Sequence, residues 1–202
     1  MNLLTLEEVQ TALSEKYREK AAKYPDHYAE MIPHTPTETQ AEEVQSAFKT
    51  LTGCDCSADL AEMVNRWDFT HLDVAGYSFG FRGTFAERLV EQNRIDAVNT
   101  WWEDAFEVRP AAQLFIAQGD PYVLLLDVQN DTVLAYIADE GAQTAVKIAD
   151  KLSTCLRMLV TIQLYRPNDL GPLTVDEVKD VLGQDCDGQF WGEQIRHWAQ
   201  FN

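Results

Sequence analysis

A histidine between two aspartates is the first place where this sequence could support chemistry. His71 follows Asp68 by three residues and precedes Asp73 by two. An imidazole beside a carboxylate can carry protons near neutral pH, which is the basis of general acid–base catalysis. The chain has no Gly-x-Ser-x-Gly nucleophile elbow, and an isolated histidine of this kind is more often a turn or core residue. An enzyme that uses His71 with Asp68 or Asp73 is therefore our least favoured hypothesis.

Metal and nucleotide sites are also weakly indicated. Cys54 and Cys56 are separated by one residue, whereas structural zinc pairs leave roughly two to four. Cys155 falls on an apolar helical stripe, as expected of a small core residue. The glycines of segment 76–83 lack the spacing of a phosphate-binding loop and its Lys-Ser or Lys-Thr. The sequence predicts no metal ion and no cofactor.

The charge balance is more informative than any motif. The 202 residues include 33 acidic and 16 basic side chains, a net charge of −17 at pH 7. A field of this sign repels the phosphate backbone of DNA and RNA and attracts basic proteins. Residues 101–150 alone hold nine acids and two bases. Such an excess is compatible with an acidic surface that serves solubility, or with a face that binds a cationic partner.

A tryptophan beside this acidic excess suggests where a partner would bind. Trp101 and Trp102 cannot both point to one side of a helix, so we expect Trp102 to be exposed. Aromatic side chains concentrate at the centres of protein interfaces. An ordinary half-buried tryptophan is the alternative interpretation. The predicted partner-binding residues are Trp102, Glu103, Asp104 and Glu107, with the turn acids Asp120, Asp131, Asp139 and Glu140.

Neither a membrane span nor a signal peptide is visible. The apolar stretch at the hydrophobic peak, Tyr122–Leu126, is far shorter than the roughly 20 residues that a spanning helix needs. The first residues lack a basic region followed by a long apolar run. We therefore expect a cytoplasmic protein without a membrane partner.

Both helices and strands are predicted, and the strands form a sheet in the middle of the chain. Three apolar segments between residues 113 and 138 are separated by short turns, which predicts an antiparallel meander. Its middle strand, Tyr122–Val128, is almost continuously apolar and should be buried on both faces. Residues 69–83 predict one or two strands joined by turns, and residues 26–36 a connector. Helices are predicted over 5–24, 37–52, 57–67, 84–103 with a break near Asn93, 152–165 up to Pro167, a short segment from 174, and a last one with Phe190, Ile195 and Trp198.

One stretch of this pattern resembles a known superfamily. It has an apolar strand with a Gly-Asp turn (114–120), a strand ending in Asp (124–127), a return strand with an aromatic (133–137) and a helix (148–159). In this order the segments resemble the SUKH superfamily, the Smi/Knr-like proteins.

The resemblance implies an α+β domain in which helices cover a mainly antiparallel sheet. The whole chain, 1–202, would be a single SUKH-like domain, with a helical N-terminal extension (1–52), an α+β core (53–167) and C-terminal helices (168–202). The resemblance also implies a non-enzymatic role, because many bacterial members look like immunity proteins that neutralise a toxin.

Our first hypothesis is an immunity protein that binds a basic, nuclease-type toxin and covers its active cleft. The alternative is a non-enzymatic regulatory or scaffold protein of a housekeeping pathway.

Overall fold

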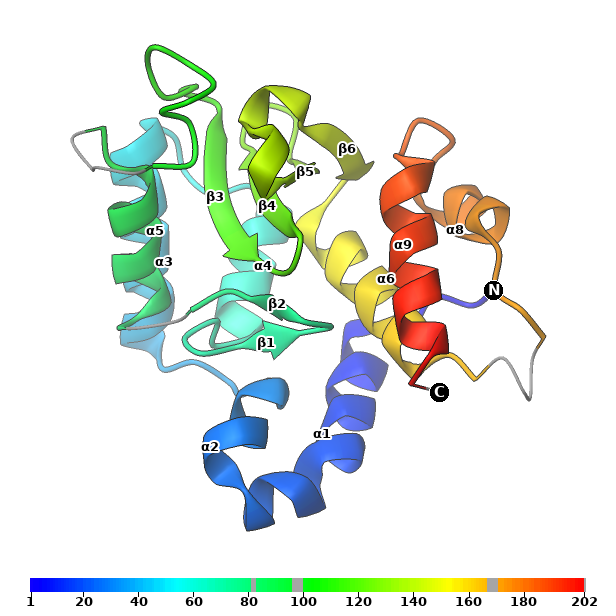
Figure 1. Ribbon diagram of the computed structural model, residues 1–202. Coiled ribbons are helices and arrows are strands. Elements are labelled where there is room, and N and C mark those ends of the chain that lie inside the picture. Colours follow the sequence, from blue (N-terminus) through cyan, green and yellow to red (C-terminus); the bar gives the residue numbers. More distant parts are fainter. Residues whose placement is uncertain (81–82, 96–99, 167–170, 202) are drawn as a thin grey trace.

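The computed structural model describes residues 1–80, 83–95, 100–166 and 171–201, and it has an antiparallel sheet flanked by helices (Figure 1). The predicted α+β class is therefore confirmed. The strands are β1 (Asp73–Val74), β2 (Tyr77–Ser78), β3 (Gln113–Gln118), β4 (Tyr122–Asp127), β5 (Thr132–Ile137) and β6 (Val146–Ala149). The helices are α1 (Leu6–Lys23), α2 (Pro25–Tyr28), α3 (Glu38–Thr52), α4 (Ala58–Arg66), α5 (Phe85–Asn93), α6 (Leu152–Leu164), α8 (Val175–Leu182) and α9 (Gly188–Ala199), with short 3₁₀ turns η1 (Ala29–Met31), η2 (Ala138–Glu140) and η3 (Ala142–Thr144).

The six strands are neighbours in chain order, from β1 to β6, and each pairs antiparallel with the next. The predicted meander over residues 113–138 is confirmed. Strand β4 lies inside it and is buried on both faces, as its composition predicted. Leu124 and Leu126 join the main core, whereas Val123 and Leu125 point to the opposite face. There they pack in a smaller group, the outer cluster, made of Phe115, Val123, Leu125, Tyr136 and Ala142.

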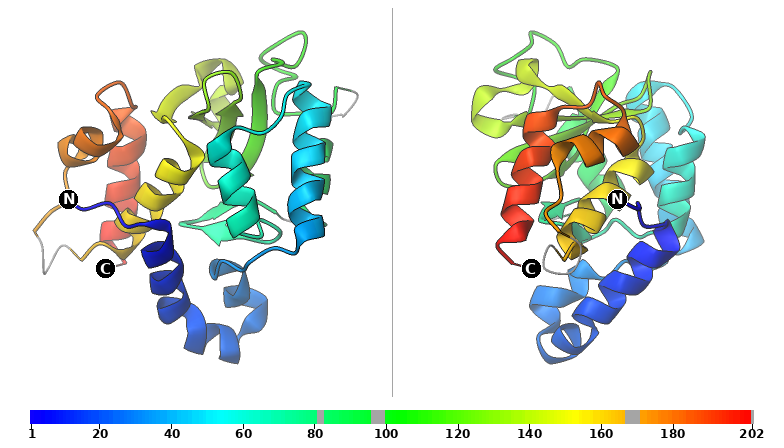
Figure 2. Two further views of the ribbon diagram at one scale, coloured as in Figure 1. Left: turned by 180° about the vertical axis from the view of Figure 1, so that it is seen from behind. Right: turned by 90° about the vertical axis from the view of Figure 1, so that its right-hand side faces the viewer.

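The main core lies between the inner face of the sheet and the helices, and helices from both ends of the chain contribute to it. Leu13 of α1 and Trp191 of α9 are both completely covered. Helix α6 is the central helix, with Cys155 and Leu159 fully buried, so the prediction that Cys155 is a core residue is confirmed. Figure 2 shows α6 between α1 and α9.

Local capping signals placed most helix starts correctly. Thr5, Thr37, Thr84 and Thr174 each form a capping box with the residue three positions later, and the Ser57 side chain caps α4. These bonds satisfy amide groups that a helix start leaves without an intrahelical partner.

The predicted break near Asn93 is confirmed, but the predicted continuation of the helix to residue 103 is wrong for the described residues 94–95 and 100–103. Helix α5 ends at Asn93, and residues 101–105 form turns. The end is fixed by tertiary contacts, since the Asn93 side chain bonds to a strand as well as to its own helix.

The helix predicted from periodicity over 152–165 is confirmed as α6, whereas the start at Ile148 implied by the resemblance is wrong, because Ile148 and Ala149 belong to strand β6. Pairing of β6 with β5 outweighs the helical pattern, and the Ile148 carbonyl accepts a bond from Trp191 Nε1 at 3.0 Å. The connector predicted at 26–36 begins with the short helix α2 and the turn η1. Pro167, predicted to end α6, lies outside the described residues.

Candidate protein-binding surface

The loop before β3, which is described over residues 100–112, carries the first group of predicted binding residues. Its apolar residues Trp101, Ala105 and Phe106 pack onto the outer cluster of the sheet. Glu103 and Asp104 stand between them in the sequence and are exposed, as is Glu107 further along the loop. The loop therefore covers the outer face of the sheet with its apolar side chains and leaves its carboxylates in solvent.

Trp102 is not the exposed anchor that the sequence suggested. Its side chain is only 5% exposed, and its ring packs edge-on against Trp101 at a centroid distance of 5.5 Å. Helical phase gave the wrong answer because the segment is a turn, in which the Trp102 carbonyl accepts bonds from the amides of Ala105 and Phe106. A large apolar side chain that this loop does expose is that of Val108, at 66%.

A completely buried amide, Asn93, holds the loop against the sheet. Asn93 Oδ1 accepts bonds from the Phe115 amide at 2.7 Å and from Trp101 Nε1 at 3.1 Å. Its Nδ2 donates to the carbonyls of Phe115 and Leu89 at 3.0 and 2.9 Å. Four bonds satisfy every donor and acceptor site that an amide strongly favours. The sequence hinted at this residue only as a break in a helix.

The second group of predicted residues, Asp120, Asp139 and Glu140, is exposed at one end of the β4–β5 hairpin. The Ala138 amide donates to the Pro121 carbonyl at 3.0 Å, which ties the β3–β4 turn to the end of β5. Residues 142–145 that follow pack on the same outer cluster as the loop before β3. Figure 1 shows the two segments close together at the top of the molecule.

Glu193 in the middle of α9 and Asp187, the N-cap of that helix, lie close to this second group, and sequence reasoning missed both. The Tyr122 hydroxyl donates to Glu193 Oε2 at 2.7 Å. Burial raises the pKa of Tyr122, and its bond to Glu193 and the negative charges of Glu193, Asp187 and Glu140 raise it further. No local pattern connects the two acids with Tyr122, because Asp187 lies 65 and Glu193 lies 71 positions after it in the chain.

Asp131, the eighth predicted residue, has a structural role. It lies at the opposite end of the β4–β5 hairpin from Asp120, and its Oδ1 accepts a bond from Ser57 Oγ at 2.6 Å. Burial raises the pKa of the Asp131 carboxyl. The contact joins the turn after β4 to the start of α4, so we remove Asp131 from the candidate surface.

The remaining exposed acids are notable for what they do not contact. We call Glu103, Asp104, Glu107, Asp120, Asp139 and Glu140 the acidic outer face. Among the described residues, no ion pair or hydrogen bond engages the side-chain carboxylate of Asp104, Glu107, Asp120, Asp139 or Glu140. Carboxylates in this state can accept charge-assisted hydrogen bonds from lysine and arginine side chains of a partner.

The predicted pairing of His71 with an aspartate is not found. Asp68 accepts bonds from Gln40 Nε2 at 2.8 Å and from the Thr70 amide, and Asp73 accepts one from the Gly76 amide. The carboxylate within ion-pair distance of His71 is that of Glu30, whose Oε1 lies 3.9 Å from His71 Nδ1. His71, His34, Glu30 and Asp68 nevertheless line a common surface cavity of about 400 Å³.

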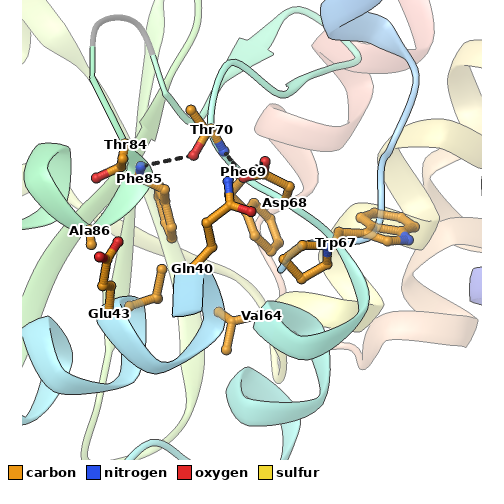
Figure 3. Close-up of a pocket in the computed structure, with 12 residues that line it drawn as sticks. Gln40, Glu43, Val64, Trp67, Asp68, Phe69, Thr70, Thr84, Phe85 and Ala86 are labelled. Atoms are coloured by element: carbon orange, nitrogen blue, oxygen red, sulfur yellow. Dashed lines mark hydrogen bonds between the residues drawn. The ribbon is translucent and has the colours of Figure 1, made fainter. Parts of the chain in front are cut away.

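A second hollow beside Asp68, drawn in Figure 3, is nearly filled by protein. Its free interior of about 10 Å³ is at the lower limit for one water molecule. Gln40 and Thr70 reach across it to Asp68, and Thr70 Oγ1 accepts a bond from the Phe85 amide. This contact network joins α3, the segment before β1 and α5, and it leaves no room for a substrate.

The cysteines show no arrangement typical of a metal site. Cys54 is exposed, and burial together with Asp55 raises the pKa of the Cys56 thiol to about 11. Within residues 1–80, 83–95, 100–166 and 171–201, no three His, Cys, Asp or Glu side chains are placed to hold a metal ion.

Comparison with known proteins finds no family model that matches the chain, and no significant match among curated proteins or solved structures. In the part of the chain that the structure describes, no helix is long and apolar enough to cross a membrane.

Proposed function

We propose that this protein is an immunity-type binding protein that neutralises a basic, nuclease-type toxin by covering its active cleft. The observation that carries the proposal is the acidic outer face, where Asp104, Glu107, Asp120, Asp139 and Glu140 are exposed without a cation partner among the described residues. A nuclease binds its polyanionic substrate through basic residues. The unpaired carboxylates of the acidic outer face are negatively charged, as the phosphates of that substrate are, and so present the same sign of charge to the basic cleft.

The net charge of −17 supports fast association with such a partner. Complementary fields steer two proteins together and raise the association rate by about 10- to 1000-fold, an effect that salt reduces. The buried clamp at Asn93 holds the acidic loop in one conformation, which lowers the entropy lost on binding. Val108 offers an apolar contact next to Glu107, as interface centres require.

Membership of the SUKH superfamily is part of the same proposal. The meander from β3 to β5 followed by α6 keeps the order of elements on which the resemblance rests, although the helix begins at Leu152 and follows an additional strand, β6.

The test begins with capture of the tagged protein from native lysate, washed at low salt and at roughly 0.5 M salt, where charge interactions beyond a few ångströms are screened. We expect one basic polypeptide at near-equal stoichiometry. Expressed alone it should arrest growth, and co-expression of this chain should restore it. A captured partner that is harmless when expressed alone would refute the immunity role, and a large housekeeping complex would favour the regulatory or scaffold alternative.

The location of the interface is tested by charge reversal. The variant D104K/E107K/D139K/E140K should slow association by at least about tenfold and flatten its salt dependence, because steering depends on local charge. The matched control E38K/E42K/D176K/D180K changes the net charge equally at exposed acids elsewhere. Equal slowing in both variants would show that only net charge matters, and would remove this surface from the proposal.

A further inference from the structure

A cluster of basic side chains interrupts the acidic surface on the second half of α1. Lys16, Lys20 and Lys23 follow one another at about one-turn intervals, on the flank of the buried stripe that includes Leu13 and Tyr17. Arg166, just after α6, is close enough to Lys16 for their charges to repel. We call Lys16, Lys20, Lys23 and Arg166 the basic patch.

The basic patch is uncompensated, although the chain has two acids for every base. Lys49, Arg66, Arg88, Lys147 and Arg196 all have a carboxylate within ion-pair distance. In the described part of the chain, none of the four patch residues has one.

The protonated state of Lys16 is disfavoured by its surroundings. Burial lowers the pKa of Lys16, and the positive charges of Lys20 and Arg166 lower it further. A bound anion would relieve this repulsion.

Aromatic rings hold the ammonium groups in place. Lys20 Nζ lies 5.4 Å from the ring centroid of Tyr28 and 6.0 Å from that of Tyr17, and these two rings stack on each other. Lys16 Nζ lies 5.7 Å from the Tyr17 centroid and 5.9 Å from that of Trp198, and it donates to the Gln163 carbonyl. Cation–π contacts fix an ammonium group without neutralising it. The patch is therefore a set of positioned positive charges.

Two distant parts of the chain build this site. Trp198 comes from the last turns of α9, whose end lies near α1 in Figure 1. Lys23 lies over the ring of Tyr24 at 5.1 Å, and that ring is 48% exposed. The site consequently joins α1, the end of α6 and the end of α9.

We infer that the basic patch binds a compact ligand that carries several phosphate groups. Each phosphate monoester has a charge of about −1.5 to −2 and three strong acceptor oxygens, which match ammonium and guanidinium donors. The α-carbons of Lys16 and Lys23 are about 10 Å apart along the helix axis, so one compact ligand reaches the whole row. A long polyanion is disfavoured because the surrounding acidic surface would repel the parts that extend beyond the patch.

Inorganic tripolyphosphate is the probe for this inference, titrated calorimetrically into the full chain at about 0.15 M salt, where the Debye length is about 8 Å. We expect saturable binding with one ligand per chain. The variant K16Q/K20Q should bind at least about tenfold more weakly, because it removes two charge-assisted contacts. The control K49Q/K151Q removes two exposed lysine charges away from the patch and should stay within about twofold of the parent protein.

Vesicle flotation distinguishes the two sources from which clustered phosphate groups could come, a free soluble ligand and the headgroup of a membrane lipid. Phosphatidylcholine vesicles that contain a bisphosphorylated phosphoinositide are compared with vesicles of equal charge that contain phosphatidylserine. Tripolyphosphate binding without flotation assigns a free ligand. Flotation specific to the phosphoinositide, abolished in K16Q/K20Q, assigns a lipid headgroup. Failure of both probes to bind, or equal weakening in the two variants, would overturn the inference.

Discussion

Replacing Asn93 by alanine should remove a large share of the folding stability. The side chain is completely buried and makes four hydrogen bonds, two of them to the backbone of Phe115 and one to the indole of Trp101. The substitution leaves three groups without partners: the buried amide and carbonyl of Phe115, and Nε1 of the partly buried Trp101. Each costs about 1–3 kcal/mol when left unsatisfied. Because local relaxation and water entry recover part of this, we expect a loss of about 3–5 kcal/mol.

Urea unfolding followed by circular dichroism and tryptophan fluorescence measures this loss. With an unfolding slope of about 2 kcal/mol per M, the midpoint should fall by about 2 M. Gln92→Ala, at the neighbouring helix position, is the matched control and should change stability by no more than about 0.5 kcal/mol. Hydrogen exchange at the Phe115 amide should accelerate in Asn93→Ala alone. If Asn93→Ala lowers the free energy of unfolding by less than about 1 kcal/mol and leaves hydrogen exchange at the Phe115 amide unchanged, the argument is refuted that the Asn93 side chain satisfies and protects the backbone of β3 at Phe115.

Three further substitutions test other contacts. Burial raises the pKa of the Asp73 carboxyl above its ordinary value, so ionisation of this group at neutral pH favours the unfolded state. Asp73→Asn should therefore raise the melting temperature at pH 7 and leave it unchanged near pH 3, where the carboxyl is protonated in both states. Ser57→Ala should cost about 1–2 kcal/mol in urea unfolding, because it removes the α4 cap and its bond to Asp131; a loss near zero would contradict that role. A side chain at Gly80 would meet backbone atoms at 2.7 and 2.9 Å, whereas Gly76 faces open space at φ +83°. Thermal unfolding should therefore show Gly80→Ala as the more damaging of the two, and the reverse order would contradict the packing argument.

The sequence predicted elements well wherever the deciding contacts are local. A capping threonine and the glutamate or glutamine three residues later identify a helix start without knowledge of the rest of the chain, and Thr5, Thr37, Thr84 and Thr174 were all interpreted correctly. The burial of β4 on both faces likewise followed from its own composition.

Predictions failed where tertiary contacts decide the outcome. The end of α5 depends on a bond from Asn93 to a strand 22 residues later, and β6 depends on pairing with β5. Trp102 is buried because its segment is a turn packed on the sheet, which helical phase cannot describe. Six of the eight predicted interface residues are exposed acids, but Asp131 could be separated from them only by its bond to Ser57.

The contacts between α1 and α6 also bear on how the chain folds. Strands β3, β4, β5 and β6 pair in sequence order with short connections, so this part of the sheet can form from local hairpins. The Leu4 amide and carbonyl, in contrast, bond to Thr161 and Arg157 of α6, more than 150 residues away. During synthesis the part of the apolar stripe of α1 that packs on α6 stays uncovered until α6 has been made, although Tyr17 can already stack on Tyr28. We expect pulse-labelling hydrogen exchange to show protection of the β3–β5 hairpins before α1, and simultaneous protection would contradict this order.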